Sequence, residues 1–256
     1  MRAVYTADSA KGKSKVIIVA LRLCGIDAAP QTPSCPGMEK ALVIGASGGI
    51  GAAVAAALVA RGCAVTGLSR SADGLDVTVP ASVEAALARL DVPFDLIFVA
   101  LGILAPPGGA PEKSLTAIDG AAMARVMATN AIGPALILRH VPRLLASDGR
   151  VAVLSARVGS IGDNGIGGWY SYRASKAALN QIVHGAAIEL RRSHKQSVCV
   201  ALHPGTVDTP FTAKYAGRHS TVAPDLAAAN LLAVIDGLSP EQTGGFFDYA
   251  GDTVPW

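Results

Sequence analysis

The chain has 256 residues, of which 51% are apolar, and its 22 Lys and Arg against 19 Asp and Glu give a formal net charge of +3. This length fits one α/β domain with a single large core and argues against a second full domain. The basic residues are dispersed and form no run of five or six, so we expect no nucleic acid partner. The apolar run at 16–21 is far shorter than the ~20 residues of a membrane helix, so we also expect no membrane span.

Residues 1–37 combine scattered lysines with prolines at positions 30, 33 and 36, which would interrupt any regular element. We interpret this segment as a poorly ordered extension or an upstream start ahead of Met38, in preference to a targeting segment. Cysteines occur at positions 24, 35, 63 and 199. They lack CxxC spacing and follow no secretory cleavage pattern, so we expect reduced thiols and a cytoplasmic protein.

From residue 38 onward, short apolar runs alternate with longer helix-compatible stretches, as in βαβ units around a parallel sheet. Strands are predicted near 40–45, 64–69, 94–100, 150–155, 197–202 and 246–249, and helices near 49–61, 81–90, 120–146, 170–193 and 224–237. A weaker strand is expected around Leu75–Thr78. Runs such as Leu96–Val99 lack polar alternation, which favours strands covered on both faces. The predicted fold is therefore α/β: residues 38–256 form one Rossmann-type domain, a three-layer α/β/α sandwich with a doubly wound parallel sheet.

A glycine-rich turn follows the first predicted strand and opens the first predicted helix. It reads Gly45-Ala46-Ser47-Gly48-Gly49-Ile50-Gly51. Glycine permits positive φ and lets backbone N–H groups approach a phosphate at a helix N-terminus. An isolated glycine cluster would more often be an ordinary loop, but this position between strand and helix predicts a dinucleotide pyrophosphate as the ligand.

The spacing Gly45-x-x-x-Gly49-x-Gly51 resembles the short-chain dehydrogenase/reductase family, and the resemblance covers residues 38–256. Two further runs carry it, Tyr172-Arg173-Ala174-Ser175-Lys176 and Pro204-Gly205-Thr206-Val207-Asp208-Thr209. The C-terminal stretch from Gly245 to Trp256 resembles the branch of C-factor and sniffer-type carbonyl reductases. The resemblance implies an NAD(P)-dependent oxidoreductase that moves a hydride between a nicotinamide and a carbonyl or alcohol carbon of a small molecule. It also implies a homodimer or homotetramer.

Tyr172 and Lys176 are the strongest catalytic candidates. Positions i and i+4 share one face of a helix, so the phenol and the ammonium can address one ligand. A ketone that gains hydride at carbon must gain a proton at oxygen, and a nearby cation makes a phenol a better acid. We therefore predict Tyr172 as proton donor and Lys176 as its activator. Tyr170 has Ala174 at i+4, so we expect it only to line the pocket.

The resemblance adds two catalytic candidates. Asn130 lies where the family has an asparagine whose backbone holds a proton-relay water, although an asparagine in a helix is more often simply a satisfied polar residue. The family commonly has Ser-Ser-x-x-Gly after the fifth strand, whereas this chain has Ser155-Ala156-Arg157-Val158-Gly159. The position of the second serine is thus Ala156. Ser155 is the favoured replacement; Ser160 or another way of holding the carbonyl are the alternatives.

The predicted cofactor site extends beyond the catalytic helix. An acid at the end of the second strand would pair with the ribose of NAD, but Arg70 stands there and can pair with a 2′-phosphate, so NADP(H) is expected in preference to NAD(H). The alternative for Arg70 is a plain surface cation. The resemblance also implies that Asp76 and Val77 lie beside the adenine, where Asp76 would accept from the exocyclic amine, and the alternative for Asp76 is a turn residue. The predicted cofactor residues are Gly45, Ser47, Gly49, Ile50, Gly51, Arg70, Asp76, Val77, Ala100, Gly102, Asn130, Tyr172, Lys176, Pro204, Gly205, Val207 and Thr209.

Three other expectations complete the prediction. The histidines show no metal-ligand spacing, so no metal site is expected. Residues 210–222, with Phe211, Lys214, Tyr215 and Arg218, are either a substrate lid or an ordinary polar loop. The main alternative function is a cofactor-binding signalling or regulatory protein with little turnover, and a subunit that binds nucleotide only to keep its shape is a further one.

Overall fold

The computed structural model describes residues 38–256 except 91–92 and 214–219. Its sheet has six parallel strands in the order β2-β1-β3-β4-β5-β6. The strands are β1 (Lys40–Ile44), β2 (Ala64–Leu68), β3 (Phe94–Val99), β4 (Leu145–Leu154), β5 (Val198–His203) and β6 (Phe246–Asp248). The helices are α1 (Gly49–Ala60), α2 (Arg70–Asp73), α3 (Pro80–Leu87), α4 (Gly120–Met127), α5 (Gly133–Leu138), α6 (Val141–Leu144), α7 (Tyr170–Leu190) and α8 (Pro224–Gly237). The predicted α/β class and doubly wound parallel sheet are confirmed.

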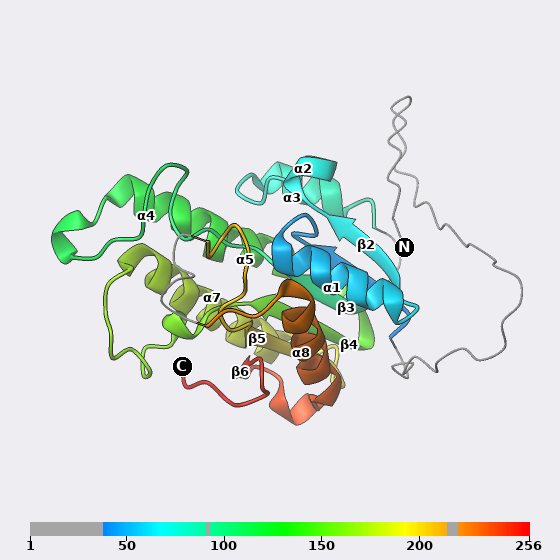
Figure 1. The fold of residues 1–256 in the computed structure, drawn as a ribbon. Coiled ribbons are helices and arrows are strands. Elements are labelled where there is room, and N and C mark those ends of the chain that lie inside the picture. Colours follow the sequence, from blue (N-terminus) through cyan, green and yellow to red (C-terminus); the bar gives the residue numbers. More distant parts are fainter. Residues whose placement is uncertain (1–37, 91–92, 214–219) are drawn as a thin grey trace, which may run out of the picture. The chain divides into compact units, whose positions relative to one another are not determined.

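Alternate residues of the central strands enter two separate cores, one on each face of the sheet. In β1, Ala41 and Val43 pack with α1 and α8, which lie side by side, whereas Leu42 and Ile44 pack on the face covered by α7 (Figure 1). Each fully buried aliphatic side chain contributes about 1.5–3 kcal/mol relative to exposure. Burial on both faces explains why these strands lack polar alternation.

The strand order fixes where a ligand can bind. From β1 the chain moves to β2 at the edge and then crosses back to β3 on the other side of β1, so the carboxyl ends of β1 and β3 border a crevice, the usual ligand position in open parallel sheets. The Ala100 amide donates to the Ile44 carbonyl oxygen over 2.7 Å, and the Gly45 amide donates to the Leu68 carbonyl oxygen over 2.8 Å. These two hydrogen bonds fix the positions at which the turns after β1, β2 and β3 begin.

The prediction of a weak strand around Leu75–Thr78 is wrong, because these residues form no strand. The Asp76 carboxylate accepts hydrogen bonds from the Thr78 amide (2.9 Å) and the Thr78 hydroxyl (2.6 Å). The Val79 amide donates to the Asp76 carbonyl oxygen, and α3 begins directly afterwards at Pro80. Aspartate side chains stabilise turns in this way, so this segment bends instead of pairing with β2.

The single helix expected over 120–146 is also divided, by a π turn (η2, Ala128–Ile132) between α4 and α5. Pro134 has no N–H, so the Asn130 carbonyl cannot accept the usual i+4 bond, and the Gly133 amide donates five residues back, to Ala128. Strand β4 then begins at Leu145 instead of near residue 150. The stretch Gly120–Leu138 is long and apolar enough to cross a membrane by length and composition alone; 39% of its apolar window is buried inside the fold, and it packs against α7.

Some predictions fall on residues that the structure does not describe. These are the extension 1–37 with Cys24 and Cys35, and Lys214, Tyr215 and Arg218 of the expected lid. Cys199 is a buried free thiol, and Cys63 is also buried, with its Sγ donating to the Met38 carbonyl oxygen over 3.0 Å.

Candidate active site

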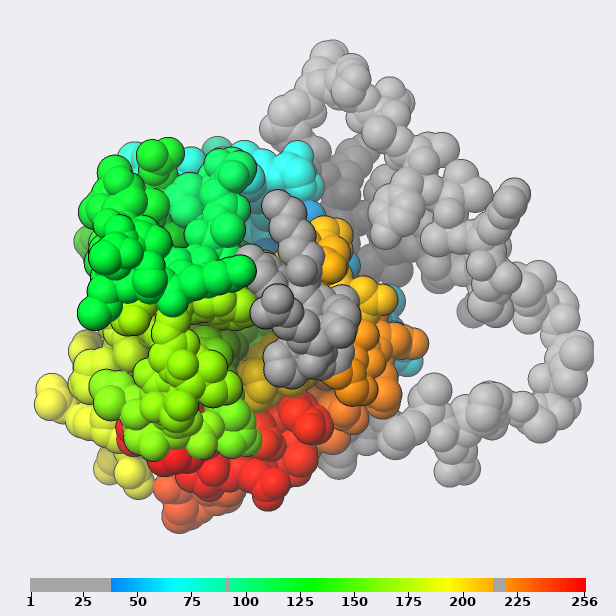
Figure 2. All heavy atoms as spheres, turned by 60° about the vertical axis from the view of Figure 1, so that its left-hand side comes forward, coloured from blue at the N-terminus to red at the C-terminus, as the bar shows by residue number. Residues whose placement is uncertain are grey.

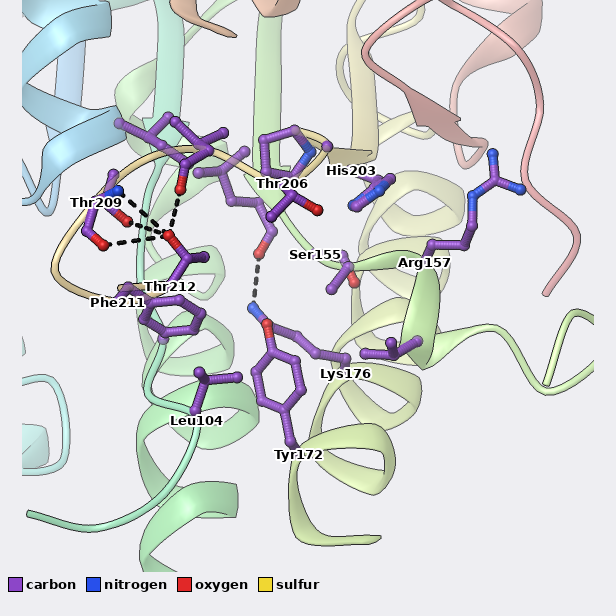
Figure 3. A pocket seen from close by; sticks show the side chains of 18 of the residues that line it. Leu104, Ser155, Arg157, Tyr172, Lys176, His203, Thr206, Thr209, Phe211 and Thr212 are labelled. Carbon is purple, nitrogen blue, oxygen red and sulfur yellow. Dashed lines mark hydrogen bonds between the residues drawn. The ribbon is translucent and has the colours of Figure 1, made fainter. Parts of the chain in front are cut away.

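A cavity of about 1050 Å³ opens at the carboxyl ends of the central strands. On one face of the molecule, the surface of residues 100–125 (green) lies beside that of residues 155–170 (yellow-green) (Figure 2). Inside the cavity, Tyr172 and Lys176 lie between Leu104 and Phe211 on one side and Ser155 and His203 on the other (Figure 3). Of the predicted site residues, the lining includes Ser47, Gly49, Ile50, Gly51, Ala100, Gly102, Ser155, Tyr172, Lys176, Pro204, Gly205, Val207 and Thr209.

The glycine-rich turn has the geometry that a phosphate ligand requires. Gly45 has φ +90°, and a Cβ on it would lie 2.2 Å from the Ala100 carbonyl oxygen; a Cβ on Gly51 would lie 2.2 Å from the Gly45 oxygen. Helix α1 begins after Gly48 with no side-chain cap and no acid in its first turn. Its first amides have no acceptor within the helix, and the positive end of the helix dipole faces the cavity, so the turn fits a pyrophosphate.

The turn is in contact with the loop after β5. A Cβ on Gly49 would lie 2.5 Å from the Thr209 Cγ2 methyl, so the absence of a side chain allows this contact. The Thr212 hydroxyl in turn donates to the Val207 carbonyl oxygen and accepts from the Thr209 amide over 3.2 Å. The first and last predicted cofactor segments are therefore positioned against each other.

Tyr172 and Lys176 lie on successive turns of α7 and are both buried, with 6% and 3% of their surface exposed. The Lys176 Nζ donates to the carbonyl oxygens of Leu154 (2.9 Å) and Leu101 (3.3 Å) and lies 6.0 Å from the Tyr172 ring centre. An ammonium has three donors, so one remains for a ligand. Burial raises the pKa of the Tyr172 phenol and lowers the pKa of Lys176 to about 7. The described residues place no acid in an ion pair with Lys176.

Asn130 does not line the cavity but braces its wall from behind. Its Oδ1 accepts from the Ile103 amide (2.8 Å), and its Nδ2 donates to the Ile103 carbonyl oxygen (2.8 Å) and to the Ser175 hydroxyl (3.0 Å). The Ser175 hydroxyl donates onward to the Tyr172 carbonyl oxygen. Asn130 thus links the chain after β3 to helix α7. Because Pro134 has no N–H, the backbone carbonyl of Asn130 is also free of the usual helical bond.

The serine position differs from the family pattern in geometry as well as in sequence. Ser155 lines the cavity, but its hydroxyl donates to the Asn180 Oδ1 over 2.5 Å. Ala156 lines the cavity at the position of the usual serine. Ser160 does not line it; its hydroxyl is buried and accepts from the Asp163 amide. The structure therefore brings Ser155 to the site and leaves Ser160 outside.

Four other predicted cofactor residues lie outside the cavity lining: Gly45, Arg70, Asp76 and Val77. Arg70 is exposed at the first position of α2, just beyond the end of β2, and forms no ion pair among the described residues. The Thr78 hydroxyl and amide, followed by a smaller effect of Arg70, hold the pKa of Asp76 below its usual range. Asp76 thus has the turn role that competed with adenine recognition, and Val77 is buried against Gly133.

The expectation that Tyr170 lines the cavity is wrong. It lies two residues before Tyr172, and residues i and i+2 of a helix point to different sides. Sequence reasoning also missed Leu104, Trp169 and His203, which line the cavity. No motif marks them, although the two glycines before Trp169 indicate an unusual backbone there.

His203 ends β5 beside a charged cluster. Arg157 Nη2 donates to the Asp248 Oδ2 over 2.8 Å, and Arg157 Nη1 lies 3.4 Å from the Asp163 carboxylate. Burial, with a smaller contribution from Arg157, lowers the pKa of His203 to about 4, so the imidazole is neutral at physiological pH. The positive charge of Arg157 is balanced by the carboxylates of Asp248 and Asp163. The rest of the cavity lining is mostly apolar.

Comparison with known proteins gives consistent matches. A family model described as Enoyl-(Acyl carrier protein) reductase matches residues 45–236. The chain is 35% identical over 234 residues to 1-hydroxy-2-glutathionyl-2-methyl-3-butene dehydrogenase of Rhodococcus sp. (strain AD45), covering 86% of this chain and 100% of the relative. It is 43% identical over 142 residues to C-signal of Myxococcus xanthus, covering 54% and 81%. The structure of NADPH-bound carbonyl reductase from chicken fatty liver matches with a TM-score of 0.73 at 26% identity, over 86% and 99% of the two chains.

Proposed function

The chain belongs to the short-chain dehydrogenase/reductase family and is an NAD(P)-dependent oxidoreductase, and on this premise we propose that it is an NADPH-dependent carbonyl reductase with Tyr172 as proton donor. The predicted family and its C-factor branch are confirmed by the relatives, C-signal among them. The buried pair of Tyr172 and Lys176, in a cavity that extends from the phosphate turn, is the observation that supports the finer assignment.

The chemistry needs a proton at the substrate oxygen. The reduced nicotinamide, when bound, supplies the hydride, and the carbonyl oxygen becomes basic as its carbon is reduced. The Tyr172 phenol is protonated at neutral pH and can donate, but burial raises its pKa and by itself makes it a weaker acid. The ammonium of Lys176 then stabilises the phenolate that remains. With a pKa of about 7, Lys176 can also lose a proton readily and help to restore the phenol.

Ser155 is our proposed carbonyl-polarising group. It is the serine hydroxyl nearest in sequence to the family position, and it lines the cavity. In the structure its proton is directed to Asn180, so it must rotate to donate to a substrate oxygen. Ser155→Ala therefore lowers kcat if Ser155 has this role. An unchanged kcat would show that the tyrosine and the cofactor hold the carbonyl alone.

NADP(H) is our proposed cofactor in preference to NAD(H). Arg70 lies at the end of β2, on the side of the phosphate turn where the sheet order places the adenosine half of a dinucleotide. Its guanidinium suits a phosphate and forms no ion pair among the described residues. We also propose a homodimer or homotetramer, because Ile132 and Ile188 on the outer faces of η2 and α7 are each 52% exposed. A sizing column tests this.

A cofactor-binding regulatory protein with little turnover is the second candidate. Two observations favour it: the identity to C-signal and the absence of a serine at position 156. This candidate predicts tight nucleotide binding with no substrate-dependent oxidation. It also predicts that Tyr172→Phe leaves the biological role intact.

The experiment starts with fluorescence titration of the purified full chain with NADPH and with NADH. Oxidation of the preferred cofactor is then measured with aldehydes, ketones and quinones. Tyr172→Phe should keep cofactor affinity and lower kcat by about 10²- to 10⁴-fold, the usual effect of a general acid. Tyr170→Phe is the matched control, because this phenol lies outside the cavity lining. NADPH binding without turnover on any carbonyl supports the regulatory candidate, and absence of nucleotide binding refutes both.

A further inference from the structure

The chain enters the catalytic helix through three consecutive residues with positive φ. Gly167 has φ +70°, Gly168 has +67° and Trp169 has +52°. Glycine adopts this region freely, but a residue with a bulky side chain is strained there. Trp169 is the one non-glycine residue with positive φ in the described part of the chain. Strained residues of this kind concentrate at functional sites, and they persist only where neighbouring groups hold them in place.

Glu112 is the residue that holds this segment. Its backbone oxygen accepts from the Trp169 amide over 2.5 Å. Its carboxylate accepts from the Ser171 amide (3.2 Å) and from the Ser171 hydroxyl. Glu112 is 9% exposed, and none of the ion pairs in the described residues involves it. A buried carboxylate without a cation is stable only where hydrogen bonds satisfy it, so the start of α7 is its binding partner.

Helix α7 lacks a side-chain cap of its own, because Trp169 at the N-cap position makes no capping hydrogen bond with its side chain. Glu112 therefore caps a 21-residue helix from a distant loop. A carboxylate at a helix N-terminus also interacts favourably with the helix dipole. Burial raises the pKa of Glu112, but the Ser171 and backbone hydrogen bonds outweigh it and leave the pKa below its usual range. Glu112 is therefore an anion at neutral pH and acts continuously as a cap.

The clamped tryptophan lies against the catalytic phenol. The rings of Trp169 and Tyr172 meet edge-on, with centres 6.2 Å apart and planes at 68°. The rings of Phe211 and Tyr172 also lie close together, with centres 6.2 Å apart and planes at 57°. Both aromatic residues line the cavity, and Leu104 adds an apolar wall near the phenol (Figure 3). A substrate carbonyl that reaches Tyr172 must place its neighbouring group between these side chains.

We propose that Glu112 positions Trp169 beside Tyr172 and that the indole selects carbonyl substrates carrying a flat apolar group next to the reacting carbon. The proposal rests on the carbonyl reductase function proposed above. Trp169 is then a specificity-determining residue. Glu112 is a positioning residue that acts through the backbone of residues 169 and 171.

Two variants of Trp169 distinguish the effect of its ring from the effect of its backbone conformation. Trp169→Gly removes the ring and relieves the backbone strain, while Trp169→Phe keeps a ring in the same position. The KM for an aryl ketone and for a small aliphatic ketone are measured for each. We expect Trp169→Gly to raise the KM of the aryl ketone by about tenfold, the equivalent of one lost aromatic contact with its burial, and to leave that of the aliphatic ketone within about twofold. Trp169→Phe should stay close to the wild type.

Variants of Glu112 are tested by the ratio of the KM for the aryl ketone to the KM for the aliphatic ketone. Glu112→Ala should reproduce the loss of aryl selectivity, and Glu112→Gln, which keeps an acceptor for Ser171, should fall between it and the wild type. Glu189→Gln, an exposed change on the same helix, is the matched control. A purely structural role would lower kcat equally for both ketones and leave the ratio unchanged, which would overturn the proposal.

A binding measurement separates this proposal from the function on which it rests. In a Trp256→Phe background, Trp169 is the single tryptophan of the chain. The aryl ketone is titrated into the NADP-saturated protein while Trp169 emission is followed. Saturable quenching that is lost in Glu112→Ala supports the proposal even if the enzyme reduces no ketone. Turnover of the aryl ketone with no change in Trp169 emission would refute the proposal and leave the reductase function in place.

Discussion

Replacing Gly49 with alanine tests whether the phosphate turn and the loop after β5 form one cofactor site. The new Cβ would lie 2.5 Å from the Thr209 Cγ2 and 3.1 Å from the Thr209 Cβ, distances at which one of the two segments has to move. Overpacking of this kind costs about 1–3 kcal/mol. In a domain of this size, Tm falls roughly 2–4 °C per kcal/mol. Because Thr209 is displaced from the cofactor side of the cavity, we also expect NADPH affinity to fall about 5- to 30-fold.

A second substitution identifies the contact as the cause. Thr209→Ser removes the Cγ2 methyl and keeps the hydroxyl, so Gly49→Ala combined with Thr209→Ser should recover most of the lost stability and affinity. The remaining 3.1 Å contact to the Thr209 Cβ makes the recovery incomplete. Gly185→Ala is the matched control: its Cβ would meet nothing within 4 Å inside α7, so it should stabilise the protein by about 0.5–1 kcal/mol.

The assays are thermal unfolding with and without NADPH and fluorescence titration of the same samples. If Gly49→Ala unfolds and binds NADPH like the wild type, the contact is not restrictive and the reasoning is wrong. If Gly49→Ala alone and the double variant Gly49→Ala with Thr209→Ser lose the same stability and NADPH affinity, the contact with Thr209 is not the cause, and the cause lies elsewhere in the turn.

Three further predictions follow from single groups. Arg70→Ala should weaken NADPH about 10- to 100-fold, as expected for lost charge-assisted bonds, and leave NADH affinity nearly unchanged in titrations; equal effects on both cofactors would contradict the assigned 2′-phosphate contact. Lys176 has its pKa lowered from 10.5 to about 7 by burial, so the unfolded chain binds more protons between these values. The wild type should therefore gain stability relative to Lys176→Met as pH rises from about 7 towards 10 in urea unfolding, and a flat difference would refute this. Burial raises the pKa of Cys199 to about 12, so iodoacetamide should label the Cys199 peptide only after unfolding, as followed by mass spectrometry; rapid labelling of the native protein would show that the thiol is accessible.

The fold could be predicted from the sequence where burial alone determines structure. Each of the six main strands overlaps its predicted range, because continuous apolar runs between helical stretches have few other stable arrangements; only β4 differs clearly, since it begins at Leu145. The failures occur where single side chains redirect the backbone. Asp76 bends the expected weak strand into a turn, and Pro134 divides the long helix at Asn130. Such effects depend on local hydrogen bonds that apolar periodicity does not report.

The candidate site shows the same division. Motifs of fixed spacing placed Gly49, Tyr172 and Lys176 correctly in the cavity lining, because each motif is a short segment whose geometry is local. Glu112 and Trp169 carry no motif: 57 residues apart in sequence, they meet because the loop before η1 (Leu115–Ala117) lies against the start of α7. Contacts between distant loops depend on the whole fold, so no sequence pattern could have predicted this pair.

The burial of Lys176 bears on the choice between an enzyme and a regulator. Its ammonium is 3% exposed and is held by two backbone carbonyl oxygens, with no acid in an ion pair among the described residues. Burying a cation in this way is unfavourable, and a pKa lowered to about 7 expresses that cost. A protein that only bound nucleotide could hold its ligand with neutral donors and avoid this cost. The proton transfer that we propose for Lys176 and the neighbouring buried phenol would account for this cost, and on this ground we infer turnover in preference to a purely regulatory role.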